Sequence, residues 1–104
     1  MKKLVLIIAL LLSACSSPSQ AMTNKELLEN FSDDERFGYI TGTIEALAFV
    51  AKVNKRQEAA TCLTNWFFGE GDGMTEIVNR IHDLPDKAPQ ATIYVLARKK
   101  CGKF

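Results

Sequence analysis

Apolar residues recur at steps of three and four positions through the middle of the chain, and this spacing limits its fold more than any other feature. After Ser32 it predicts one apolar stripe on a long helix, formed by Phe37, Ile40, Ile44, Leu47, Ala48 and Ala51. Residues at this spacing lie on one face of an α-helix, whereas a half-buried strand requires strict alternation of apolar and polar residues. No segment alternates for long enough to demand a strand. The sequence therefore predicts an all-α fold.

Two helix starts are marked by a hydroxyl residue followed three positions later by glutamate. Thr23-x-x-Glu26 and Ser32-x-x-Glu35 match the capping box, in which the hydroxyl and the carboxylate bond backbone amides that lack helical partners. The first start predicts a short helix to about Asn30, and the second predicts the long helix.

The C-terminal half predicts two further helices after a glycine-rich break. Three glycines within residues 69–73 are expected to interrupt regular structure. The helix that follows, stopped near Pro85, carries Met74, Ile77, Val78 and Ile81. Pro89 suits the first turn of a last helix. The apolar side of that last helix carries Ile93, Leu96, Ala97 and Cys101.

Two parts of the helical pattern leave alternatives open. Residues 55–68 fit either a helix, with Ala59, Cys62, Leu63 and Trp66 on one face, or a turn and a loop. Gly38 and Gly42 lie one turn apart on the long helix, where glycine costs stability, so the pair indicates close approach by another helix. That helix could belong to the same domain or to a second copy in a homodimer, and we expect the former.

The first 14 residues carry the three parts of a secretory signal. Lys2 and Lys3 form a positive region, Leu4 to Leu12 form an apolar region, and small residues follow. The apolar run is shorter than the roughly 20 residues that span a bilayer as a helix. A retained transmembrane anchor is therefore the weaker interpretation, and residues 1–14 are expected to be a signal peptide.

The end of this segment resembles the lipobox of bacterial lipoproteins, in which a cysteine is acylated and cleavage precedes it. Residues 12–15 read Leu-Ser-Ala-Cys, and Cys15 directly follows the apolar region. The alternative is ordinary cleavage after Ala21, where residues 19–21 read Ser-Gln-Ala. We expect acylation of Cys15, which would anchor the chain to a membrane.

Acylation would divide the mature chain into a lipidated tether, residues 15–22, and a single folded domain, residues 23–104. Ser16, in the place where aspartate would retain a lipoprotein at the inner membrane, indicates sorting to the outer membrane with the domain in the periplasm. Cleavage before Cys15 removes two of the 13 basic residues and none of the 12 acidic ones. The nearly neutral remainder has no basic run, which argues against nucleic acid as a partner.

A domain of about 90 residues has a small core and is marginally stable unless it is cross-linked. With Cys15 assigned to lipid, Cys62 and Cys101 remain as a pair in an oxidising compartment. The sequence therefore predicts a small helical bundle of four to five helices held by one disulfide. Two free buried cysteines are the alternative.

The residues offer no catalytic group of recognisable geometry. His82 is the only histidine, and its neighbour Asp83 would not face it on a helix. One histidine and two separated cysteines do not supply a zinc site, and Glu70 with Asp72 lack the register of a calcium loop. We expect a protein that is not an enzyme and that binds no cofactor or metal.

One segment has the composition of a protein-docking site. Trp66, Phe67 and Phe68 precede the acidic glycine segment that contains Glu70 and Asp72. Three consecutive aromatic residues cannot all face the core, so at least one is expected near the surface. Exposed aromatic residues are typical of binding hot spots, and we expect Trp66, Phe67, Glu70 and Asp72 to contact a partner. The alternative is a simple helix connection with its aromatic residues in the core.

The order of these features resembles the Tai/Rap family of immunity proteins, which protect bacteria from type VI secretion amidase effectors. The resemblance rests on Phe37-Gly38-Tyr39-Ile40-Thr41-Gly42 and on the two cysteines, Cys62 and Cys101. It covers residues 37–101. The segment after Cys62 departs from it, because the family has a short proline-containing stretch there.

The resemblance implies a small, disulfide-bonded periplasmic protein, often dimeric, that blocks the catalytic cleft of a peptidoglycan amidase effector. Two other functions stay open. One is a small helical periplasmic chaperone that would release apolar surface when its carboxylates are protonated, and the other is a structural envelope lipoprotein.

Overall fold

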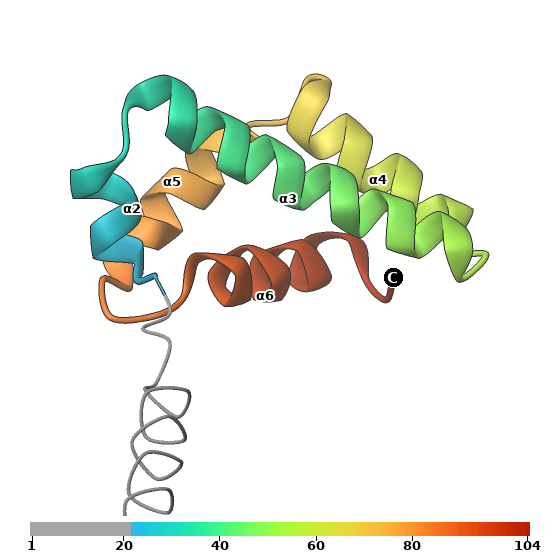
Figure 1. Ribbon diagram of the computed structural model, residues 1–104. Helices are drawn as coiled ribbons and strands as arrows, with labels where there is room; N and C mark the ends of the chain where they lie inside the picture. Colours follow the sequence, from blue (N-terminus) through green and yellow to red (C-terminus); the bar gives the residue numbers. More distant parts are fainter. Residues whose placement is uncertain (1–21) are drawn as a thin grey trace, which may run out of the picture.

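The computed structural model describes residues 22–104, so the predicted signal peptide, Cys15 and nearly all of the tether lie outside the described residues. The described part is all-helical, which confirms the predicted fold class. Its five helices are α2 (Asn24–Asn30), α3 (Asp33–Val53), α4 (Gln57–Phe68), α5 (Gly73–Asp83) and α6 (Pro89–Cys101). The long helix α3 crosses the molecule, with α4 alongside it, α6 below it and α2 and α5 near its first turns (Figure 1). None of these helices is long and apolar enough to cross a membrane.

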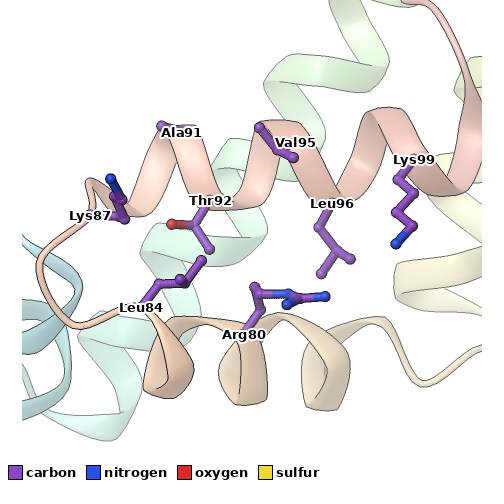
Figure 2. A pocket seen from close by; sticks show the side chains of 8 residues that line it. All are labelled: Arg80, Leu84, Lys87, Ala91, Thr92, Val95, Leu96 and Lys99. Atoms are coloured by element: carbon purple, nitrogen blue, oxygen red, sulfur yellow. The ribbon is translucent and has the colours of Figure 1, made fainter.

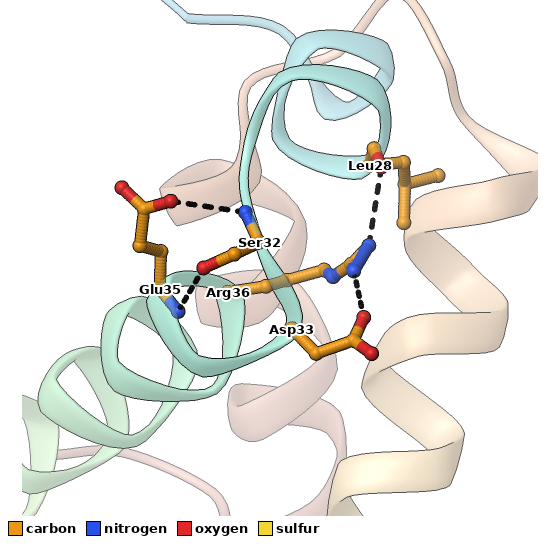
Figure 3. A network of polar contacts seen from close by, with 5 residues as sticks. All are labelled: Leu28, Ser32, Asp33, Glu35 and Arg36. Atoms are coloured by element: carbon orange, nitrogen blue, oxygen red, sulfur yellow. Dashed lines mark hydrogen bonds and ion pairs between the residues drawn. The ribbon is translucent and has the colours of Figure 1, made fainter.

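Side-chain capping sets the starts of α2 and α3. The Thr23 hydroxyl accepts from the Glu26 amide at 3.2 Å. At Ser32 the full capping box is present: its hydroxyl accepts from the Glu35 amide, and its own amide donates to the Glu35 carboxylate at 3.0 Å (Figure 3). The backbone donor and the hydroxyl of Ser32 favour the charged carboxylate and lower the pKa of Glu35. Arg36 joins the two helices by donating to Leu28 O on α2 and to the Asp33 carboxylate on α3.

The segment that the sequence left open forms the helix α4. It follows α3 after a turn of three residues, in which the Arg56 amide donates to Ala51 O at 2.7 Å. Lys55 takes a left-handed backbone conformation, with φ of 59°, to make this turn. So short a connection makes α3 and α4 antiparallel neighbours.

The two C-terminal helices follow the predicted boundaries. α5 ends at Asp83, two residues before Pro85, and α6 begins at Pro89. α6 ends at Cys101 and is followed by Gly102, whose φ of 80° favours glycine. The Tyr39 hydroxyl on α3 donates to Gln90 Oε1 on α6 at 3.1 Å, and partial burial raises the pKa of Tyr39.

The core lies where all five helices meet. Its fully buried large apolar side chains are Leu27, Ile40, Ile44, Leu63, Ile77, Ile81 and Ile93. A second, smaller cluster joins Ala51 on α3 to Ala59 and Ala60 on α4, close to the turn between them. Small side chains allow the two helices to approach closely there.

Two expectations for α3 were wrong. Phe37 lies on the predicted stripe, yet 58% of its surface is exposed. α4 has 12 residues against 21 in α3, so the antiparallel partner ends before it reaches the first turns of α3. No helix of the domain approaches Gly38 or Gly42, because a Cβ built on either residue has nothing within 4 Å. Close approach occurs at the alanine cluster instead.

The disulfide between Cys62 and Cys101 is present, as the sequence predicted. It joins α4 to the last residue of α6, with 5.6 Å between the two Cα atoms and a sequence separation of 39. The bond connects the C-terminal helix to the antiparallel pair formed by α3 and α4.

Candidate functional site

The aromatic residues at the end of α4 divide between core and surface. Trp66 and Phe67 are buried, whereas half of Phe68 is exposed. The expectation that at least one of the three lies near the surface is confirmed. Trp66 and Phe67 belong to the main core, so neither offers its ring to a partner unless the helix moves. Phe68 is the aromatic residue that this segment presents to solvent.

The glycine segment is a tight link that folds back on the end of α4. A Cβ on Gly71 would lie 2.6 Å from the Trp66 carbonyl oxygen, and one on Gly73 would lie 2.7 Å from the same atom. A Cβ on Gly69 would lie 2.6 Å from Asn65 O. These contacts are with backbone atoms, which cannot move cheaply. The glycines are therefore explained by close packing rather than by flexibility.

The link leaves one exposed cluster, the α4–α5 tip, which we define as Phe68, Glu70 and Asp72. All three side chains are exposed. The Phe68 ring stands edge-on to the Phe67 ring, with 4.8 Å between the centroids, so a core residue supports the exposed one. Because the glycines hold the link against α4, both carboxylates extend from a backbone of fixed shape.

The other candidate groups are not brought together. His82 and Asp83 are adjacent and exposed at the end of α5, where neighbouring helical side chains do not face each other. In the same residues, no group of three or more histidine, cysteine, aspartate or glutamate side chains could hold a metal ion.

A second surface, which sequence analysis missed, lies along α3. Phe49 and Val53 are 66% and 62% exposed. With the exposed Gly38, Gly42 and Ala46 they form what we call the α3 face, on the side of the helix opposite the buried Ile40 and Ile44. The signal was available, because these five residues also recur at steps of three and four. The sequence analysis inferred a helix contact from Gly38 and Gly42 alone and did not extend it to Ala46, Phe49 and Val53.

Charges of opposite sign flank the α3 face. Asp34 is exposed in the first turn of α3, and Lys52 is exposed in its last turn. The two residues are 18 positions apart, which is five full turns, so they lie on the same side of the helix. This arrangement complements itself when two such helices run antiparallel.

No protein-family model matches the chain, and neither the curated proteins nor the solved structures include a match. The described residues offer a limited chemistry for function. It consists of a disulfide-linked helical scaffold, an exposed tip with one aromatic and two acidic residues, and an exposed apolar helix face. Both surfaces are suited to contact with another macromolecule.

Proposed function

We propose that this chain is a lipid-anchored periplasmic immunity protein that binds a type VI secretion peptidoglycan amidase and blocks its catalytic cleft. Its contact with the amidase includes the α4–α5 tip. The proposal draws on the resemblance carried by residues 37–42 and the two cysteines, and on the signal segment that ends at Cys15.

The α4–α5 tip is the observation that carries the proposal. A protein that blocks a cleft needs a shaped projection whose conformation costs little entropy to fix on binding. The backbone contacts of Gly71 and Gly73 with Trp66 meet this requirement. Phe68 is the exposed apolar contact, and Glu70 and Asp72 suit the polar or cationic groups that receive the peptide stem of peptidoglycan.

The proposal is tested by measuring inhibition of the cognate type VI amidase effector. Glu70→Ala with Asp72→Ala should weaken binding at least severalfold and reduce protection of cells, and Phe68→Ala should weaken it further. The matched control is Glu58→Ala with Asp86→Ala, which removes the same charge from exposed positions away from the tip. Full binding and full protection by the tip variants would exclude this interface.

We also propose that two copies pair through their α3 faces in antiparallel orientation. Gly38, Gly42 and Ala46 let the two backbones approach closely, and Phe49 and Val53 supply the apolar contact. Asp34 of each copy would meet Lys52 of the other. This proposal concerns a different surface, so it can fail without affecting the assignment of the tip.

The α3 face also favours a second candidate function, that of a small periplasmic chaperone, because exposed apolar side chains can hold unfolded clients. The two functions differ in what covers the face. A chaperone should suppress the aggregation of unrelated unfolded proteins, and Phe49→Glu should abolish that effect. An immunity protein should bind one folded amidase and leave aggregation unchanged.

A further inference from the structure

An apolar groove runs between α5 and α6 at a place that the proposed function does not use. Its volume is about 380 Å³, within the range of ordinary ligand pockets. Leu84 reaches it from the end of α5, and Thr92 and Leu96 reach it from α6 (Figure 2). Ala91 and Val95 complete its α6 side, and Val95 is 63% exposed.

Three cationic side chains border this apolar surface, and each comes from a different element. Arg80 extends from α5, Lys87 lies in the α5–α6 turn at one end of the groove, and Lys99 lies on α6 at the other end (Figure 2). No acidic residue lines the groove. The ion pairs within residues 22–104 are Arg36 with Asp33 and Lys100 with Glu76, so all three groove cations lack an acidic partner there. The groove is thus suited to a ligand that is both apolar and anionic.

The start of the folded domain lies beside this groove. The Asn24 amide donates to Lys87 O at 2.8 Å, and the Lys25 amide donates to Pro85 O at 3.1 Å. The tether of residues 15–22 would therefore leave the fold next to the Lys87 end of the groove. Eight residues reach roughly 28 Å when fully extended. Acylation of Cys15 would hold this end of the domain within that distance of the bilayer.

We propose that the groove binds an anionic phospholipid of the membrane to which the chain is anchored. The acyl region would cover Leu84, Val95 and Leu96, and the phosphate would lie at the end of the groove beside Arg80 and Lys99. Lys87, at the other end, would face the anionic headgroups of the same leaflet. A basic patch beside a lipid anchor adds a second attachment to the same membrane. An acidic peptide has similar chemistry, but the lipid is favoured because the tether keeps it at high local concentration. This inference rests on the proposed anchor at Cys15.

The groove orients the domain as well as attaching it. With the α5–α6 side on the bilayer, α3 lies on the other side of α6 (Figure 1). Lys52 is exposed on α3 and should remain in solvent, whereas Lys87 and Lys99 should be covered. Lys52 and the groove lysines therefore report the orientation within one sample.

The test is an amine-labelling footprint of the mature protein on vesicles, read by mass spectrometry. One vesicle is phosphatidylcholine alone, and the other contains phosphatidylglycerol as well. Labelling of Lys87 and Lys99 should be roughly fivefold slower on the anionic vesicles. Lys52 should label alike on both. High salt should restore the labelling of the groove lysines, because the attraction is electrostatic.

The variant Arg80→Gln removes one groove cation without touching a labelled residue, and it should reduce the protection of Lys87 and Lys99. The matched control is Arg56→Gln, an exposed arginine in the α3–α4 turn, which should leave the protection unchanged. Thermal melting of both variants shows whether they remain folded. Equal protection in the Arg80 variant and the original chain would overturn the assignment of the phosphate site.

The remaining outcomes separate this inference from the immunity proposal. Equal labelling of Lys87 and Lys99 on both vesicles would overturn the lipid assignment, even if the protein inhibits its amidase. A mature Cys15 without acyl chains would remove the premise and overturn it too. Protection that arises only when the amidase is added would make the groove a protein contact. Protection by anionic vesicles in a protein that inhibits no amidase would leave the groove assigned and refute the immunity proposal.

Discussion

Asn24 is fully buried at the first position of α2, and its side-chain amide joins three parts of the chain. The amide nitrogen donates to Leu84 O at 2.8 Å and to Thr92 Oγ1 at 2.9 Å. Its backbone amide donates to Lys87 O. The bond to Thr92 is buried and the bond to Leu84 O is partly buried, so water only partly replaces the amide when it is removed. One polar residue therefore fixes α2 against the end of α5 and the start of α6.

Asn24→Ala should lower the free energy of unfolding by about 1 kcal/mol. It removes the hydrogen bonds to Leu84 O and Thr92 Oγ1, and the loss is partly offset because Asn24 Oδ1 is buried without a partner. Asn30→Ala is the matched control, since Asn30 is an exposed asparagine in the same helix. It should change stability by less than about 0.5 kcal/mol. Urea unfolding followed by circular dichroism measures both values. Equal effects of the two substitutions would show that the buried bonds contribute little.

The candidate site shows how far single residues could be assigned from sequence. The pattern predicted that at least one of three consecutive aromatic residues is exposed, but it assigned the partner contact to Trp66 and Phe67 rather than to Phe68. Which of them is exposed depends on the angle at which α4 packs, and that angle places Trp66 and Phe67 in the core and Phe68 outside. Asn24 was missed for a similar reason. Its burial depends on contacts 60 and 68 residues away, which leave no local pattern.

At the scale of elements, local signals predicted most of the helix boundaries. The capping box at Ser32 and Pro89 at the start of α6 act within one turn, so sequence alone shows them. The segment 55–68 could not be decided, because α4 begins without a side-chain cap. The sequence wrongly predicted that Phe37 is buried. The apolar spacing of α3 extends to its first turns, which α4 does not reach. Which turns of a helix are covered depends on the lengths of its neighbours.

The two kinds of glycine should respond in opposite ways to alanine. Gly42→Ala should raise the stability of the monomer by up to about 1 kcal/mol, because the site is an open position inside a helix. Gly71→Ala should lower stability by roughly 1–3 kcal/mol, because its Cβ would overlap the Trp66 backbone. Chemical unfolding at low protein concentration measures both. Stabilisation by Gly71→Ala would show that the link does not hold the backbone contact described here.

At the scale of the whole molecule, three connections hold the C-terminal end of the chain to α3 and α4. The disulfide joins α4 to α6. Asn54 Nδ2, at the end of α3, donates to Phe104 O at 3.3 Å. Phe104 also packs against the alanine cluster of α3 and α4, and its ring lies edge-on to Tyr94 of α6 with 5.6 Å between centroids. A small core therefore gains constraints at the side where α6 would otherwise separate from α4.

Replacing both Cys62 and Cys101 by serine should lower the free energy of unfolding by about 4 kcal/mol, the chain-entropy value for a loop of this length. This loss is a large part of the stability of a domain of this size, so the thermal midpoint should fall clearly. Scanning calorimetry of the oxidised protein and of the variant measures it. Alkylation of the non-reduced, denatured protein provides the control and should find no free thiol at either position.

The pairing of two molecules through the α3 face gives the last prediction. Phe49→Glu would place a charge in the apolar contact and should raise the dimer dissociation constant by at least roughly tenfold. Phe37→Glu is the matched control, since Phe37 is also exposed on α3 but lies outside this face. Asp34→Lys should weaken the dimer through like charges, and adding Lys52→Asp should restore it, as expected for directly coupled residues. Sedimentation equilibrium measures all four variants. Equal weakening by Phe37→Glu and Phe49→Glu, or no rescue by the second charge reversal, would contradict the antiparallel arrangement.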